Sequence, residues 1–271
     1  IASPLPTQPD HDEALDGKGL HRANLCRASR KDLRDAVVKA RAVQEKWASQ
    51  SGYLRGQILY RMAEMMESRV PAFESALRGS GLSAAAARGE VRATIDRIVH
   101  FAGWSDKYQA LLSSVNPVAS SYFDFSLPEP TGVVGVVAPG SPALLGLVSH
   151  VLPVIVSGNS CVVLLSESDP IPGLEWAEVL ATSDLPGGVV NLLSGPRSET
   201  LPHLARHMDV NALALAGLPK EIEVETRKDA AVNVKRVTGY ALGDYAADRV
   251  EKLDLIRAFT ETKTTWHPVG W

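Results

Sequence analysis

Histidine and cysteine residues are the first candidates for chemistry in this chain. His203 and His207 lie four positions apart, the spacing that places two imidazoles on one helical face, as in a helical metal site. No third ligand or acidic partner stands at a matching position, so we predict no metal centre. Cys161 opens an apolar run with no histidine beside it to activate a thiolate, and we interpret it as a buried structural residue rather than a nucleophile.

A serine nucleophile and a nucleotide-binding loop are the next two possibilities, and neither pattern is complete. Ser141 does not lie in the Gly-x-Ser-x-Gly turn of hydrolases, so the sequence gives almost no support for hydrolysis. The segment Ala138-Pro139-Gly140-Ser141-Pro142 follows an apolar run, where dinucleotide-binding proteins carry Gly-x-Gly-x-x-Gly. That fingerprint is absent, so this motif alone predicts little cofactor binding.

Composition and charge exclude several classes of function. The chain has 271 residues, 45% of them hydrophobic and 22% charged, with a net charge of −3, which is typical of a soluble protein with a sizeable core. There is no basic excess for nucleic acid, and the most apolar stretch, residues 143–156, is too short to span a membrane. Two distant cysteines and no visible secretory signal favour the cytoplasm. A small basic cluster is interpreted as a solvated face: Arg227, Lys228, Lys235 and Arg236.

Helical periodicity dominates residues 29–111. Ser29 and Asp32 form a capping-box-like start for a first helix, and Ser83 opens another that we expect to reach about residue 111. Between them, a second helix carries an apolar stripe that includes Met62, Met65 and Met66. We interpret the methionine-rich stripe as core, because that is much commoner than a methionine binding surface.

From residue 130 onward the period changes to short apolar runs separated by helical segments. The expected strands are 133–137, 161–165, 189–193 and 212–215, and the expected helices are 142–157, 171–182 and 198–207. Strands that are apolar on both faces and alternate with helices predict an α/β fold, a Rossmann-like doubly wound parallel sheet. Residues 112–128 are predicted to form a projecting β-hairpin, and residues 256–266 to form one more strand.

The order of several motifs resembles the aldehyde dehydrogenase superfamily. The segment EPTGVVGVVAPGSPALL, from Glu129 to Leu145, is similar to the family's strand and turn EPxGVxGxIxPWNxPLL. The resemblance continues upstream in HFAGWSDKYQ and SYFDFSLPEP, and downstream in LPGGVVNLLSG, HMDVNALALAG and VNVKRVT. These matches follow one another in the family's order from residue 29 onward, which implies the family's fold.

The resemblance also implies that several working positions of the family are replaced. Ser141 stands where the family has the asparagine that donates to the oxyanion, a contribution of about 3 kcal/mol, and a hydroxyl there is too short to reach. Leu164 stands in place of the lysine that holds the adenosine ribose, whereas the companion acidic residue is kept as Glu167.

Two glycine turns of the family are only partly kept. Gly195 remains, but the next glycine of that turn corresponds to Arg197 or its neighbourhood. In the Gly-Ser-Thr turn Gly217 is followed by Leu218 and Pro219, which lack the hydrogen-bonding side chains. Losing several donors at about 1 to 3 kcal/mol each predicts a vestigial cleft with NAD or NADP affinity weakened by orders of magnitude. The residues assigned to this cleft are Pro139, Ser141, Glu167, Gly195 and Gly217.

The resemblance places no catalytic residue in this chain. Tyr240 stands where the family has its glutamate base, and the unperturbed pKa of tyrosine, about 10, makes it a poor base at neutral pH. After Gly243 the family would supply a second α/β module with the nucleophilic cysteine, whose thiolate attacks the aldehyde before hydride transfer. Here the chain proceeds instead to AFTETKT, which resembles the family's C-terminal oligomerisation strand. The thiol-bearing module is therefore expected to be absent.

These observations favour an associating role over catalysis. Residues 1–111 and 129–243 are predicted to form the NAD-binding-like domain, and residues 112–128 plus 244–271 an oligomerisation element. The closest resemblance is to the non-catalytic second domain of family 16 aldehyde dehydrogenases, so the expected partner is a catalytic aldehyde dehydrogenase, or the chain itself, through 112–128 and 257–266. Two alternatives remain: a nucleotide-binding sensor with a weakened cleft, and an NAD(P)-dependent aldehyde dehydrogenase, which would need a thiol that the sequence does not offer. Either the tail from Asp244 or a partner is expected to cover the apolar surface that the missing module leaves.

Overall fold

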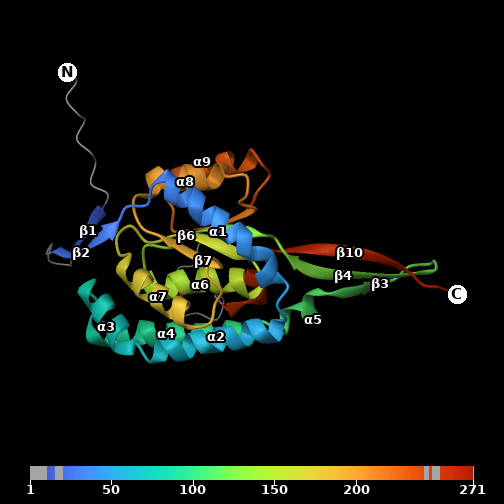
Figure 1. Cartoon of the computed structure of the whole chain (residues 1–271), viewed down its shortest axis with the longest axis horizontal. Helices are drawn as coiled ribbons and strands as arrows, with labels where there is room; N and C mark the ends of the chain where they lie inside the picture. The colour runs from blue at the N-terminus through green and yellow to red at the C-terminus, as the bar shows by residue number, and fades with distance from the viewer. Residues whose placement is uncertain (1–10, 16–20, 241–243, 246–250, 271) are drawn as a thin grey trace, which may run out of the picture.

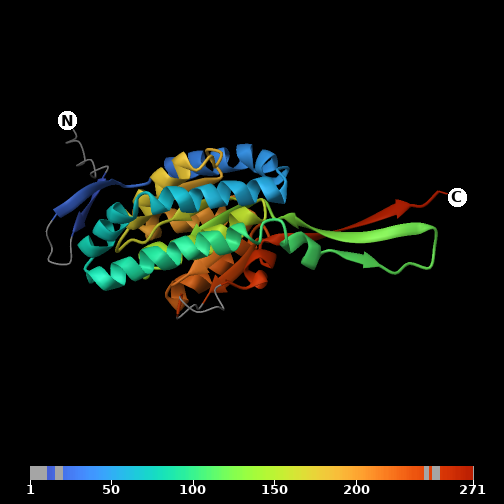
Figure 2. The same ribbon diagram turned by 90° about the horizontal axis from the view of Figure 1, so that it is seen from below.

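The fold is an α/β body from which a long β-ribbon projects. The computed structural model describes residues 11–15, 21–240, 244–245 and 251–270 (Figure 1). A two-stranded antiparallel sheet of β1 (His11–Leu15) and β2 (His21–Cys26) lies at one end of the body, and the ribbon leaves from the other end (Figure 2). The small sheet was not predicted from the sequence.

A five-stranded parallel sheet forms the centre of the body, as predicted. Its strands run in the order β7-β6-β5-β8-β9, so the chain moves outward from β5 to β7 and then returns to the other side of β5. The strands are β5 (Val133–Val137), β6 (Ser160–Leu164), β7 (Val190–Leu193), β8 (Ala212–Ala216) and β9 (Arg236–Tyr240). This doubly wound order places a crevice between the carboxyl ends of β5 and β8, where such sheets bind their ligands.

Helices cover both faces of the sheet, because alternate strand residues are apolar on each face. One face packs against α1 (Arg30–Ala48), α8 (Arg197–Arg206) and α9 (Lys220–Ala231). The other face packs against α6 (Ala143–Val156) and α7 (Ile171–Thr182), with further helices outside them. Gly135 allows α8 to approach the sheet closely, since a Cβ there would lie 2.9 Å from the Leu204 side chain.

The outer helices are α2 (Gly52–Glu67), α3 (Val70–Gly79), α4 (Ala84–Ala102) and α5 (Tyr108–Leu112). Met62 and Met66 are fully buried, which confirms the interpretation of the methionine stripe as core. The prediction that one helix runs from Ser83 to about residue 111 was wrong. Helix α4 ends at Ala102, because the Ser105 hydroxyl donates to the Ala102 carbonyl and starts a turn before α5.

The ribbon is a three-stranded antiparallel sheet in the order β10-β4-β3. Its strands are β3 (Ser114–Asn116), β4 (Tyr122–Pro130) and β10 (Thr260–Pro268). The predicted last strand, 256–266, begins too early, because Ile256 belongs to a short helix, α10 (Leu253–Arg257), and is buried together with Phe259. The register pairs Thr260 with Pro130 and Pro268 with Tyr122, so β10 follows β4 along its full length.

Candidate functional site

The carboxyl edge of the parallel sheet brings together all five residues assigned to the cofactor cleft. Pro139 and Ser141 follow β5, Glu167 follows β6, Gly195 follows β7 and Gly217 follows β8. Pro139 is buried and Gly195 half-buried, whereas the other three are exposed. Their assembly at one edge follows from the parallel topology.

At the crevice between β5 and β8, the two loops lie side by side. Gly217 has a φ of 64°, a conformation that favours glycine, and a Cβ built on it would lie 3.5 Å from the Pro139 Cα. Leu218 and Pro219 then lead into α9. The turn therefore keeps its backbone shape but presents no hydroxyl toward the crevice.

The guanidinium of Arg197 bridges the ends of β5 and β6 at the carboxyl edge of the sheet. The side chain is only 9% exposed, and its Nη2 donates to the carbonyls of Ala138 and Leu165, the residues that follow β5 and β6. Its Nε lies 3.3 Å from the Leu165 oxygen. Burial lowers the pKa of Arg197, although nearby Glu167 acts in the opposite direction. The arginine thus occupies space between the strand ends at the position where the family resemblance places a glycine.

Glu167 is engaged by the chain itself rather than left open to a ribose. Its Oε1 accepts a hydrogen bond of 2.6 Å from the backbone N–H of Arg197, the first residue of α8. A carboxylate at this position satisfies a free N–H and complements the positive end of the helix dipole. The start of α8 is thereby closed to an external anion.

The start of α6 is closed in the same way by Glu90, a residue of α4 that sequence reasoning missed. Its Oε1 accepts hydrogen bonds from the backbone N–H groups of Leu144, at 2.9 Å, and Leu145, at 3.1 Å. Burial raises the pKa of this carboxyl, partly offset by the two hydrogen bonds. No spacing in the sequence reveals this contact, because Glu90 and α6 belong to separate helices.

The third helix that starts at this edge also carries acidic residues. Glu221 and Glu223 lie in the first turn of α9, and Glu223 pairs with Arg227 four residues later. A dinucleotide pyrophosphate binds best at a helix N-terminus with free N–H groups. Here Glu90 and Glu167 accept from the N–H groups that start α6 and α8, and the first turn of α9 carries Glu221 and Glu223 beside Lys220, so the residues present fit a pyrophosphate poorly.

Gly195 lies beneath the segment that joins β2 to α1. A Cβ on Gly195 would lie 3.1 Å from the Ala28 nitrogen, and that nitrogen donates to the Ser194 carbonyl. Arg27 also forms an ion pair with Glu199 of α8. This side of the edge is therefore covered by the chain.

Neither cysteine lies in a site that could activate a thiolate. Cys161 is fully buried near the amino end of β6, remote from the carboxyl edge, and burial raises the pKa of its thiol. Cys26 ends β2 and is exposed. Tyr240 is the last residue of β9, and its side chain lies outside the described residues. The predicted Cys161 burial is confirmed.

The described residues hold no group of three or more potential metal ligands, and none of their helices is long and apolar enough to cross a membrane. The interpretation of the basic cluster as a solvated face was wrong for Lys235. Its side chain is buried, which lowers its pKa to about 8, and its Nζ donates to the His207 carbonyl at 2.7 Å. Arg236 donates to the carbonyls of Ala258 and Thr260, so it ties β9 to the start of β10.

Tyr245 and Glu251, described residues between β9 and β10, contact α4 and α6. Tyr245 hydrogen bonds with His150 at 2.9 Å, and Arg97 donates to the Tyr245 carbonyl and pairs with Glu251. Burial lowers the pKa of His150 to about 3 and raises that of Tyr245 to about 12. Either the tail from Asp244 or a partner was expected to cover the apolar surface that the missing module leaves. The tail contributes to this cover, since its residues Tyr245, Ile256 and Phe259 are buried.

Comparisons with known proteins agree with this architecture. Residues 15–255 match the sequence profile of the aldehyde dehydrogenase family. An aldehyde dehydrogenase of Davidiella tassiana is 29% identical over 215 residues, which cover 78% of this chain and 42% of the relative. The cytosolic 10-formyltetrahydrofolate dehydrogenase of Xenopus tropicalis is 30% identical over 228 residues, which cover 82% and 25% of the two chains.

Solved structures show the same fold. Betaine aldehyde dehydrogenase of Staphylococcus aureus, in complex with NAD+, superposes with a TM-score of 0.80 at 20% identity, over 85% of this chain and 46% of that one. The HpcC protein of Thermus thermophilus gives 0.79 at 23% identity, over 84% and 44%. The chain thus spans less than half the length of the relatives that it matches. With this fold and the profile match over most of its length, the chain belongs to the aldehyde dehydrogenase family.

Proposed function

We propose that the chain is a non-catalytic aldehyde dehydrogenase-like subunit or domain, which associates through its ribbon with a catalytic aldehyde dehydrogenase or with a second copy of itself. The observation that carries the proposal is an exposed apolar face on the ribbon. Side chains alternate between the two faces of a strand, so Phe123, Phe125 and Leu127 of β4 share one face. Val115 of β3 joins them, because it pairs with Phe125.

These apolar side chains are largely exposed to water in the isolated chain. Val115 is 67% exposed, Phe123 46% and Leu127 44%, and the rings of Phe123 and Phe125 lie 5.6 Å apart. A contiguous exposed apolar group on a projecting element is typical of a protein–protein contact. Burying two such aromatic rings and their neighbours contributes several kcal/mol, at about 25 cal/mol per Å².

The opposite face of the ribbon has a polar group that lacks a partner. Asp124 is 6% exposed, and its Oδ1 has no hydrogen-bond partner among the residues that the structure describes. It lies across from Trp266 of β10, whose ring contacts that of Tyr122 at 6.0 Å. A buried carboxylate oxygen without a donor is costly, so a donor from an associated chain would stabilise it.

The outer edge of β10 is a further docking feature. Within the described part of the chain β10 pairs only with β4, so its other edge presents unpaired backbone groups to an incoming strand. Glu261 and Lys263 are exposed on β10 and form ion pairs with Arg236 and Glu129 of this chain. Charges of this kind discourage unselective pairing, and they favour a specific partner.

Two features support a non-catalytic role: the side chains at the carboxyl edge and the short connection between β9 and β10. Arg197, Glu167 and Glu90 bind strand ends and helix starts of this chain at the carboxyl edge of the sheet. Residues 241–259 are the whole link from β9 to β10, too short for a further α/β domain, which needs at least about 50 residues. This connection therefore leaves no room for the thiol-bearing module between β9 and β10.

Association is tested by sedimentation velocity and native mass spectrometry of the purified chain, alone and with a catalytic aldehyde dehydrogenase from the same source. We expect a dimer or a mixed complex that Leu127→Asp disrupts. Val38→Asp is the matched control, since Val38 is 54% exposed on α1, away from the ribbon. A wild-type chain that stays monomeric at about 100 μM and binds no dehydrogenase contradicts the proposal.

Two finer assignments belong to the same proposal. A role like that of the second domain of family 16 aldehyde dehydrogenases accounts for an intact ribbon beside a nucleotide edge filled by the chain itself. A cytoplasmic setting accords with the word cytosolic in the name of the Xenopus relative and with two cysteines in no disulfide.

A further inference from the structure

A groove lined almost entirely by basic side chains lies between α1 and α8, the helices on the sheet face opposite α6 and α7. Its volume is about 760 Å³. Its lining residues are Arg30, Lys31, Leu33, Arg34, His203, Arg206 and His207. A set of four full cations and two histidines without a single carboxylate is unusual in a chain of net charge −3.

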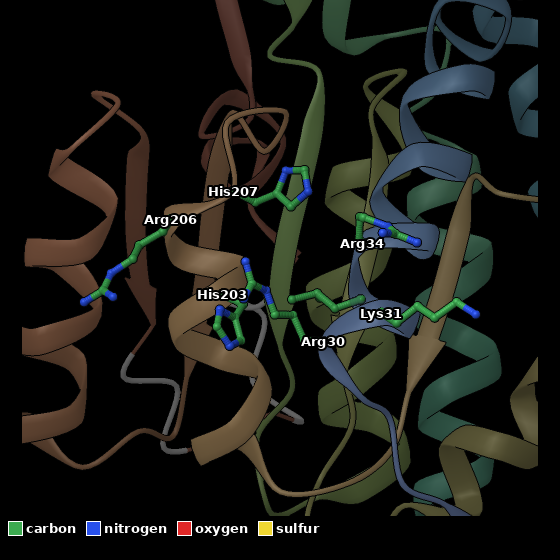
Figure 3. Close-up of a pocket in the computed structure, with 7 residues that line it drawn as sticks. Arg30, Lys31, Arg34, His203, Arg206 and His207 are labelled. Carbon is green, nitrogen blue, oxygen red and sulfur yellow. The ribbon is translucent and has the colours of Figure 1, made fainter.

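The side chains that line the groove come from two helices, α1 and α8. Arg30 reaches from α1 toward His203 of α8, and His207 lies one turn further along (Figure 3). Arg34 and Lys31 extend from α1 away from the two histidines, and Arg206 turns toward α9, where it pairs with Asp229 (Figure 3). Two helices thus contribute donors to one space.

Nearby carboxylates neutralise only part of this groove, since Arg206 pairs with Asp229 and Arg34 with Asp35. Asp32 accepts from the backbone and hydroxyl of Ser29 in the capping box that starts α1. Glu199 is paired with Arg27. Asp35 pairs with Arg34, but both side chains are more than half exposed, so water screens that pair strongly. Among the described residues Arg30 and Lys31 form no ion pair.

The basic residues also stand at an unfavourable place in their own helix. Arg30, Lys31 and Arg34 occupy the first turns of α1, where the helix dipole disfavours cations. Arg30 and Arg34 are four residues apart, so they also repel each other along the helix face. A bound anion would offset both effects.

We propose that this groove binds a small phosphate-bearing molecule, with Arg30, His203 and His207 as its principal ligands. Arginine forks and imidazole N–H groups match phosphate oxygens. The volume lies within the range of pockets for small molecules, about 300 to 1,000 Å³. The groove begins close to the nucleotide edge, since Arg30 is two residues after Ala28, which lies against Gly195. It then runs along α8 to His207, ten residues and about 15 Å beyond Arg197.

The test is calorimetric titration of the whole chain with inorganic pyrophosphate. We expect binding that weakens roughly tenfold in Arg30→Ala and again in His203→Gln. Lys39→Ala is the matched control, an exposed cation of α1 outside the groove, and it should leave the dissociation constant unchanged. Equal loss in all three variants would show a diffuse charge effect and overturn the proposal, as would no binding by the wild type.

Two further measurements distinguish the groove from the nucleotide edge and pyrophosphate from an acidic peptide. Lys220→Ala removes a cation at the start of α9, so loss of pyrophosphate binding in that variant would move the ligand to the nucleotide edge and refute the groove. Hexaglutamate should bind more weakly than pyrophosphate. If it binds more tightly, the groove recognises an acidic peptide and the small-molecule assignment is wrong.

Discussion

Acid should destabilise this protein through one buried imidazole. His150 of α6 is 3% exposed and sits against Tyr245, where burial lowers its pKa from 6.5 to about 3. Below about pH 6.5 the unfolded chain therefore takes up a proton at His150 that the folded chain does not. Stability is fully present above that pH and is lost as the pH falls toward about 3.

The size of the effect follows from the gap between the two pKa values. Each pH unit within the gap costs about 1.4 kcal/mol, so the loss between about pH 7.5 and about pH 5 is about 2 kcal/mol from this residue alone. Other groups titrate over the same range, including His207, whose pKa burial also lowers. The contribution of His150 is therefore isolated by comparison with His150→Gln, which cannot take up the proton.

The assay is urea unfolding at 25 °C, followed by circular dichroism at both pH values for the wild type and the variant. We expect the stability difference, wild type minus variant, to fall by about 2 kcal/mol on acidification. His203→Gln, at an exposed histidine of α8, serves as the control and should reproduce the wild-type pH dependence. If His150→Gln and the wild type lose stability in parallel, His150 is not the acid-sensitive group and the reasoning fails.

Four further outcomes follow from the site and the ribbon. Titration with NAD or NADP should give a dissociation constant weaker than about 100 μM, because carboxylates occupy the helix starts; tighter binding would mean that the cleft is intact. Incubation with NAD and a panel of aldehydes should form no NADH, and turnover abolished by Cys161→Ala would overturn the assignment of that residue to the core. Glu90→Ala should lower the free energy of unfolding by about 1 to 2 kcal/mol, because two N–H groups of α6 lose their acceptor, and Glu90→Gln should lower it by less. Thermal melting measures both variants, and a Glu90→Ala variant as stable as the wild type would contradict the capping role. Asp124→Asn should raise the melting temperature of the monomer but weaken association in sedimentation, and the opposite pattern would remove this carboxylate from the interface.

The sequence predicted the strands and helices that have a clear hydrophobic period. Strands β5, β6 and β8 are apolar on both faces, which only a covered parallel sheet can bury, and the stripe with Met62 and Met66 repeats at helical spacing. Helix α9 was missed because it buries only Thr226 and Ala230, so its apolar period is too weak to see. Strand β9 begins with Arg236 and contains Thr238 and Gly239, so it lacks the apolar run that identified its neighbours.

The sequence predicted which residues meet at the carboxyl edge of the sheet, but not which side chains fill the space there. Parallel topology alone brings Glu167, Gly195 and Gly217 to one edge, and the replaced glycine at Arg197 was visible in the sequence. What a linear pattern could not give is the direction of a side chain, such as the guanidinium of Arg197 across two strand ends or the carboxylate of Glu90 on a distant helix. Contacts of this kind depend on helix packing, for which the sequence carries no local signal.

Arg236 of the parallel sheet donates hydrogen bonds to the carbonyls at the start of β10, so it joins the two sheets directly. Because one arginine holds the end of the parallel sheet beside the root of the ribbon, the two halves keep their arrangement whatever lies between them. A globular unit inserted into that junction would leave this contact in place, provided that Tyr245 and Ile256 keep their buried positions. The junction is a natural place for engineering a fused cargo onto this scaffold.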